Sequence, residues 1–141
     1  MGIRLATLND VQDISRLLTQ LGYPGTEAFL ATNLAEMLPD PRELLLVWAE
    51  SGAILGFLSA DFSIYPELNG KVATIKAFAI DENARSRGIG RQMEIELTRR
   101  AGENGCNRII VHCAERRTRA HGFYFRQGFE ESPKYLIKKL I

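Results

Sequence analysis

The chain has 141 residues, of which 45% are hydrophobic and 25% are charged, and its 18 basic and 17 acidic residues give a formal net charge of +1. This length and composition are typical of one globular domain, and we expect a single domain over residues 1–141. The near balance of charge argues against a nucleic-acid binder that works by bulk charge, and no apolar run is long enough to span a bilayer.

Local patterns predict a series of short helices and strands. Thr7 and Asp10 resemble a capping box, and apolar side chains then recur at helical spacing until Gly22, which ends the helix. Ser51 and Gly52 separate two apolar runs, as in a tight hairpin. The expected elements are a strand over 3–7, a helix over 11–21, a helix over 26–38, strands over 43–50, 53–64 and 71–80, a helix that begins near Ile89, a strand over 108–113, a helix over 118–128 and a strand over 134–141.

The order of these elements is β-α-α-β-β-β-α-β-α-β. Strands dominate the middle of the chain, and helices follow the later strands. This order predicts a mixed sheet with helices packed on its faces, which is an α/β or α+β architecture.

The stretch RSRGIGRQM at residues 85–93 lies where the strand over 71–80 leads into the next helix. A glycine-rich turn at a helix N-terminus presents unpaired N–H groups and the positive end of the helix dipole, and both favour phosphates. A Walker loop is excluded because Gly70-Lys71 is followed by Val72. A dinucleotide fingerprint is also excluded, because Met93 stands where its third glycine is needed. The pattern R-x-x-G-x-G fits, although a plain helix start would contain the same residues.

A second motif, AHGFYFRQGF, occupies residues 120–129. Phe123 and Phe129 fit core positions of a short helix and the segment after it. Tyr124 differs from them, because its hydroxyl needs a hydrogen-bond partner when it is buried.

Taken together, the two motifs resemble those of the GNAT superfamily of acetyl-coenzyme A-dependent N-acetyltransferases. That family has Q/R-x-x-G-x-G/A at a strand-to-helix turn and A-x-x-F-Y-x-x-x-G-F about one strand and one helix later. The order of elements also matches, so the resemblance covers nearly the whole chain. It implies a mixed, mostly antiparallel central sheet of about seven strands, with helices on both faces and a splay between the fourth and fifth strands.

The resemblance implies transfer of acetyl from acetyl-coenzyme A to a primary amine by direct attack, with no metal. N–H groups of the 85–91 loop would hold the pyrophosphate, backbone groups of the preceding strand would bind the pantetheine arm, and one N–H near Phe78 would polarise the thioester carbonyl. Tyr124 would protonate the departing thiolate. The residues implied in cofactor binding are Phe78, Ala79, Ile80, Arg85, Ser86, Arg87, Gly88, Ile89, Gly90, Arg91 and Arg117.

Two positions depart from the family pattern. Arg117 stands where many relatives have Asn, which leaves its contact with the cofactor open. Many relatives also have a carboxylate on the strand before the loop, whereas this strand offers Thr74 and Lys76. The general base is therefore unassigned, and a water chain to Glu67, Asp61 or His112 is one alternative to an amine that arrives neutral.

The acceptor site is implied only in outline. In the family, the second helical region covers the acceptor, and here it is joined by the loop over 65–70. Candidate substrate residues are Phe29, Asn33, Tyr65 and Glu67. The acceptor is open among polyamines, amino acids, aminoglycosides and protein or peptide amines, and a homodimer is possible because relatives often dimerise.

Other readings of the sequence are weaker. Two cysteines, Cys106 and Cys113, are too few for a disulfide scaffold, and the N-terminus lacks a secretory signal. We therefore expect a cytoplasmic protein with reduced thiols. The spacing of these cysteines from His112 and His121 fits no common zinc site. A non-catalytic coenzyme A-binding sensor or scaffold remains the main alternative to an enzyme, and we expect neither nucleic acid nor membrane as a partner.

Overall fold

The computed structural model describes residues 2–112, 118–131 and 136–140 of the chain. It divides into two compact units, Met1–Ile110 and Val111–Ile141, and each is described by itself. The described elements are β1 (Gly2–Leu5), η1 (Leu8–Asp10), α1 (Val11–Leu21), η2 (Thr26–Ala28), α2 (Leu30–Met37), β2 (Glu43–Glu50), β3 (Ala53–Ile64), β4 (Lys71–Ile80), η3 (Glu82–Ala84), α3 (Ile89–Glu103), β5 (Cys106–Val111) and α4 (Thr118–Arg126).

The described strands form one mixed sheet in the order β1-β2-β3-β4-β5. The pairs β1–β2, β2–β3 and β3–β4 are antiparallel, whereas β4 and β5 run parallel and are connected through α3. Ser51 and Gly52 both have positive φ, 52° and 79°, which is the two-residue hairpin turn expected between β2 and β3. This topology makes β4 an inner strand that leads directly into the loop before α3.

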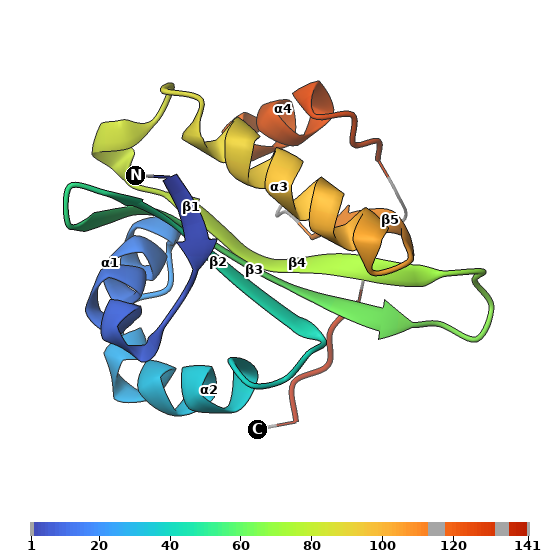
Figure 1. Cartoon of the computed structure of the whole chain (residues 1–141), viewed down its shortest axis with the longest axis horizontal. Coiled ribbons are helices and arrows are strands. Elements are labelled where there is room, and N and C mark those ends of the chain that lie inside the picture. Colours follow the sequence, from blue (N-terminus) through green and yellow to red (C-terminus); the bar gives the residue numbers. More distant parts are fainter. Residues whose placement is uncertain (1, 113–117, 132–135, 141) are drawn as a thin grey trace. The chain divides into compact units, whose positions relative to one another are not determined.

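Helices pack on both faces of the sheet, as expected (Figure 1). Phe57 on β3 belongs to the apolar cluster formed with α1 and α2, while an added Cβ on the adjacent Gly56 would lie 2.7 Å from Sδ of Met93 on α3. Since successive residues of a strand point to opposite faces, α1 and α2 cover one face and α3 covers the other. The cluster on the α1–α2 face comprises Ala6, Ile14, Leu17, Leu18, Leu30, Leu34, Leu45, Val47, Ile54, Phe57 and Ala79.

Local capping fixes the start of η1, the short turn that leads into α1, and the C-terminal end of α1. The capping box at Thr7 and Asp10 is confirmed, because the Asp10 carboxylate accepts the Thr7 N–H at 2.9 Å. Arg4 binds the same carboxylate through two nitrogens, at 2.8 and 2.9 Å. At the other end Gly22 has φ 112° and the N–H of Tyr23 donates to the carbonyl of Leu18, which is a Schellman arrangement.

Several sequence predictions need correction. The strands over 43–50, 53–64 and 71–80 are confirmed, but the helix predicted over 26–38 is divided at Phe29, whose φ of −142° is not helical. The strand predicted over 108–113 begins earlier, at Cys106, and ends at Val111.

The C-terminal strand predicted over 134–141 is wrong for residues 136–140, which are not in a strand and are exposed. Their apolar residues favoured a strand, but Leu136 and Ile137 are 92% and 75% exposed and so bury no apolar face. Residues 134, 135 and 141 lie outside the described residues. The described sheet has five strands rather than about seven, while the splay between the fourth and fifth strands and the single domain over 1–141 stay predictions.

Gly56 provides a test of the packing of α3 on the sheet. A side chain at this position would meet Met93 at 2.7 Å and Ile80 at 3.1 Å, so we expect Gly56→Val to lower the free energy of unfolding by about 1–3 kcal/mol. The matched control is Gly102→Ala in α3, where no atom lies within 4 Å of the added Cβ and helix propensity favours Ala. Urea unfolding measures both, and equal stability of Gly56→Val and the wild type would contradict the packing.

Candidate functional site

The segment between β4 and α3 is held by backbone and side-chain contacts to its neighbours. The N–H of Asp81 donates to the carbonyl of Leu55 at 2.8 Å, and the N–H of Ala84 donates to the carbonyl of Asp81 at 2.9 Å. The register between β2 and β3 shifts so that Leu55 is an extra residue on β3. The Leu55 carbonyl, in this irregular part of β3, thus holds the N–H of the first residue after β4.

Asp81 links this segment to α1. Its buried carboxylate accepts the N–H of Asn83 at 2.9 Å and forms an ion pair with Arg16, which also donates to the carbonyl of Ile54 at 2.9 Å. The Asn83 N–H first, and then Arg16, hold the pKa of the Asp81 carboxyl below its usual value. One turn further along α1, Gln20 accepts the N–H of Glu82 at 2.9 Å. The loop is therefore anchored to α1 as well as to β3.

The loop that follows directs backbone donors outward. Ser86 and Gly88 have positive φ values of 67° and 82°, and Gly88 is the N-cap of α3. The helical hydrogen bond to the Gly88 carbonyl comes from Gln92 at 3.1 Å, so the N–H groups of Ile89 to Arg91 precede the first helical bond. A Cβ added at Gly88 would meet nothing within 4 Å. The start of α3 is thus an open array of N–H donors, which suits an anion.

The three arginines of the loop have different surroundings. Arg87 pairs with Glu50 of the β2–β3 hairpin at 2.8 Å and lowers the pKa of that carboxyl, and Arg85 donates to the carbonyl of Ile80 at 3.3 Å. Arg91 is exposed, and its side chain forms no hydrogen bond or ion pair within the described part of the chain. Its guanidinium is therefore available to a ligand at the start of α3. The side chain of Ile89 is buried, so only its backbone faces the site.

Residues 78–80 of β4 lie directly before this loop. Phe78, Ala79 and Ile80 pair with Leu58, Phe57 and Gly56 of β3. β4 also carries a bulge, because Ser59 lies opposite Ala77 whereas Ala60 lies opposite Ile75. β4 is therefore a bulged strand, with Lys76 as the extra residue.

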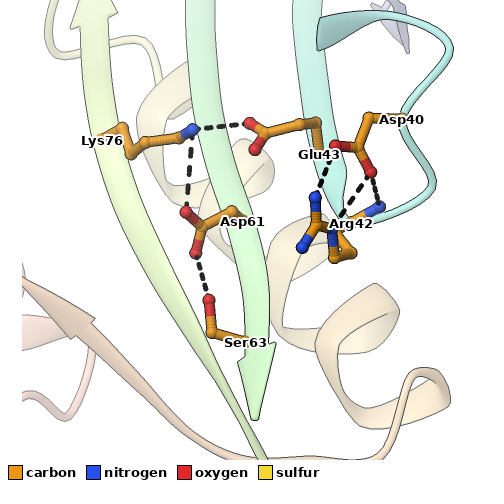
Figure 2. A network of polar contacts seen from close by, with 6 residues as sticks. All are labelled: Asp40, Arg42, Glu43, Asp61, Ser63 and Lys76. Atoms are coloured by element: carbon orange, nitrogen blue, oxygen red, sulfur yellow. Dashed lines mark hydrogen bonds and ion pairs between the residues drawn. The ribbon is translucent and has the colours of Figure 1, made fainter.

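Lys76, at this bulge, belongs to a polar network that reaches across β3 to β2 (Figure 2). Lys76 Nζ lies 2.6 Å from a Glu43 carboxylate oxygen on β2 and 3.7 Å from an Asp61 oxygen on β3. Asp61 also accepts from the Ser63 hydroxyl at 3.2 Å. Three side chains are candidates for a proton relay. Asp61 forms an ion pair with Lys76. Glu67 and His112 are exposed.

Tyr124 belongs to the C-terminal unit, on α4. Its side chain is 9% exposed, and its ring makes edge contacts with Phe123 and Phe129 at centroid distances of 5.3 and 5.2 Å. α4 ends at Arg126, and Gly128 in the following turn has a φ of 92°, which allows the N–H of Phe129 to donate to the Tyr124 carbonyl at 3.0 Å. The motif residues thus fix the position of this tyrosine within its own unit. Arg117 and Cys113 lie outside the described residues.

The candidate substrate residues lie on two separate elements. Phe29 is 52% exposed at the start of α2, and Asn33 is exposed one turn later. Tyr65 and Glu67 lie in the connection between β3 and β4, half-buried and exposed respectively. Their contact with an acceptor stays a prediction.

An open cavity of about 610 Å³ lies at the edge of the sheet near β1. Its lining includes Arg100, Glu103 and Asn104 at the end of α3, together with Asp40 and Glu43, but no residue of the 85–91 loop. Because α3 has 15 residues and rises about 1.5 Å per residue, the cavity and the loop lie at opposite ends of this helix. The cavity is therefore separate from the anion site.

Sequence reasoning found the loop but missed the residues that anchor it. Asp81 was detectable as a capping residue, since it directly precedes a short turn. Arg16 and Gln20 are one helical turn apart on α1, but no local signal connects them to residues more than 60 positions later.

The described residues contain neither a cluster of metal-ligating side chains nor a membrane-spanning helix. No group of three or more His, Cys, Asp or Glu side chains within them could hold a metal ion. None of the helices described is both long enough and apolar enough to cross a membrane. Cys106 is a free thiol at the start of β5, and burial raises its pKa.

Comparison with known proteins gives matches over most of the chain. Residues 9–129 match the model of the acetyltransferase (GNAT) family. Glucosamine 6-phosphate N-acetyltransferase 1 of Oryza sativa subsp. japonica is 31% identical over 133 residues, which cover 86% of this chain and 78% of the relative.

Solved structures agree with the fold. A transcriptional regulator from Bacillus halodurans C-125 has a TM-score of 0.89 and 26% identity, with 98% of each chain covered. Glucosamine-6-phosphate N-acetyltransferase from Arabidopsis thaliana has a TM-score of 0.85 and 21% identity, with 99% of this chain and 97% of that chain covered. The second likeness concerns the fold alone.

Asp81 provides a test of the loop anchor. Because its folded pKa is lowered, the carboxylate stabilises the fold above its usual pKa of about 3.9, and this contribution is lost as the pH falls through the lowered value. We expect Asp81→Asn to lower the free energy of unfolding by about 1–3 kcal/mol at neutral pH, and the difference from the wild type to shrink in acid.

Urea unfolding at about pH 7 and about pH 3 measures this effect. Glu82→Gln, at the exposed neighbouring residue, is the matched control and should change stability by less than about 0.5 kcal/mol. A difference between Asp81→Asn and the wild type that is the same at both pH values would contradict the role of the charge.

Proposed function

This chain belongs to the acetyltransferase (GNAT) family, and from that premise we propose that it transfers acetyl from acetyl-coenzyme A to the primary amine of a small molecule by direct attack. Family membership makes it an N-acetyltransferase that uses acetyl-coenzyme A.

The main support for the location of the donor is the open array of N–H groups at the start of α3. The N–H groups of Ile89, Gly90 and Arg91, with the Arg91 guanidinium, match the charge and the hydrogen-bonding needs of a pyrophosphate. Gly88 leaves open space above its Cα, so a phosphate is able to approach the backbone closely. Arg87, directly before Gly88, forms an ion pair with Glu50 next to these N–H groups in the sequence.

The chemistry needs three contributions from this chain. Backbone groups of residues 78–80 hold the pantetheine arm, and an N–H near Phe78 stabilises negative charge on the thioester oxygen. The lone pair of the neutral amine forms the new C–N bond, and the C–S bond breaks with its electron pair going to sulfur. The nitrogen releases a proton to solvent, and solvent returns a proton to Tyr124 at the end of the cycle. Tyr124 donates its phenolic proton to the thiolate, an uphill transfer between groups with usual pKa values near 10 and 8.5.

The proposed acceptor class is the amino sugars, ahead of polyamines, amino acids and peptide amines. The support is the relative named above, which is 31% identical and is named for glucosamine 6-phosphate. A panel of amines with acetyl-coenzyme A, read by thiol release and by mass detection of the product, tests both the reaction and the class. Binding of acetyl-coenzyme A without thiol release for any amine would contradict the enzyme and favour a coenzyme A sensor.

Gly88→Glu tests the position of the pyrophosphate site. A carboxylate at this position fills the open space and repels an anion, so we expect coenzyme A affinity to fall at least about 100-fold, a loss near 3 kcal/mol. The matched control is Gly105→Glu, which has nearly the same φ, 81° against 82°, and also meets no atom within 4 Å. Calorimetric titration with coenzyme A measures both, and an equal loss in both variants would show that strain rather than the site is responsible.

Tyr124→Phe tests the acid. The ring contacts with Phe123 and Phe129 do not need the hydroxyl, so the variant should fold and bind coenzyme A normally. Loss of the proton donor should lower kcat by about 10²–10⁴-fold. Unchanged turnover, measured by thiol release with the best amine of the panel, would remove Tyr124 from the mechanism.

A further inference from the structure

The bulge in β4 lies beside the group proposed to contact the reacting carbonyl. Lys76 is the extra residue of this bulge, and Phe78 follows two positions later, about 7 Å along the strand. A bulge interrupts the regular ladder of hydrogen bonds and bends the strand, so the direction of the N–H groups just after it depends on how the bulge is held.

The Lys76 side chain holds this bulge from across the sheet. It extends over β3 and reaches Glu43 on β2, with 2.6 Å between Nζ and Oε1, and Asp61 lies between them with an oxygen 3.7 Å from Nζ (Figure 2). Glu43 and Asp61 are opposite each other in the β2–β3 register. One ammonium group therefore joins β4 to a strand that is not its neighbour.

The contact is partly sheltered from water. The exposed fractions of the side chains are 38% for Lys76, 14% for Glu43 and 26% for Asp61. Ser59 lies on β3, beside the β4 bulge, but it does not help to hold the bulge. Its buried hydroxyl oxygen has no hydrogen-bond partner in the described part of the chain. Without the ammonium group, the two carboxylates would be like charges beside each other, with only the weaker attraction of the nearby Arg42 guanidinium to offset their repulsion.

We infer that Lys76 and Glu43 are positioning residues for the acetyl transfer, because their ion pair fixes the bulge that aims the N–H near Phe78 at the thioester carbonyl. This inference rests on the proposed function. An oxyanion donor acts only at hydrogen-bond distance from the developing charge, and a displacement of about 1 Å can lower the rate about 100-fold. In this role Lys76 accepts no proton from the amine. It therefore does not replace the carboxylate base that many relatives have on this strand.

The direct test is the infrared carbonyl band of acetyl-coenzyme A that carries ¹³C at the thioester carbonyl. In the wild type we expect a shift to lower frequency on binding, because the N–H polarises the carbonyl. Lys76→Met and Glu43→Gln should lose most of this shift and lower kcat about 10- to 100-fold, while the dissociation constant of acetyl-coenzyme A changes less than about threefold. Lys76→Arg, which is able to keep the ion pair, should restore most of the shift.

The matched control is Arg42→Met. Arg42 also forms an ion pair near this end of the sheet, with Asp40 at 3.2 Å, but neither residue lies on β4 (Figure 2). Its band position, kcat and dissociation constant should equal those of the wild type. Circular dichroism and thermal unfolding monitor the fold, and Glu43→Gln carries the test if Lys76→Met does not fold.

The outcomes separate this inference from the proposed function. A wild-type band shift and turnover that persist in Lys76→Met and Glu43→Gln would overturn the positioning role and leave the acetyl transfer intact. Loss of acetyl-coenzyme A binding in step with kcat would also overturn it, because the pair would then support the binding site as a whole. A wild type that binds acetyl-coenzyme A but shows no band shift would instead contradict the proposed N–H contact.

Discussion

The carboxylate of Asp81 is the contact on which the arrangement of the site depends. It stands where β4 ends, and it holds the N–H of Asn83, which starts the turn, and Arg16, which belongs to α1. Because both partners donate to a single buried group, the direction of β4, the turn and α1 are set together. The chain is then free to use a left-handed conformation at Gly88 and to begin α3 with its N–H groups exposed. An anion site that rests on backbone groups needs this external support, since the loop itself contains few internal hydrogen bonds.

β4 connects this anion site to the proposed reaction centre. Its last residues precede the loop, and its bulge at Lys76 lies two positions before Phe78. The two ends of this short stretch are held by charges on different elements, Asp81 with α1 at one end and Lys76 with β2 at the other. The backbone of this stretch is therefore fixed at both ends, and a ligand that lies along it contacts a backbone of defined geometry.

Features that depend on neighbouring residues were predictable from the sequence. Three such features were predicted where the structure has them, because each involves only residues a few positions apart. They are the capping box of Thr7 and Asp10, the hairpin turn of Ser51 and Gly52, and the helix end at Gly22. The loop at residues 85–91 was also recognisable, because glycine at a strand-to-helix turn has a local cause. By contrast, the pairs Arg16–Asp81 and Glu43–Lys76 depend on which strands become neighbours and in which register. The C-terminal run shows the same limit, since its apolar residues favoured a strand over 134–141, whereas residues 136–140 are exposed and bury no face.

We propose that the start of α3 and the end of β4 form one continuous binding surface for the acetyl donor. The most direct measurement is amide chemical-shift mapping of the ¹⁵N-labelled protein during titration with acetyl-coenzyme A. We expect the largest shifts at residues 78–80 and 85–91, with little change at the cavity near β1. Shifts that concentrate at that cavity or on α2, with the 85–91 amides unmoved, would contradict it.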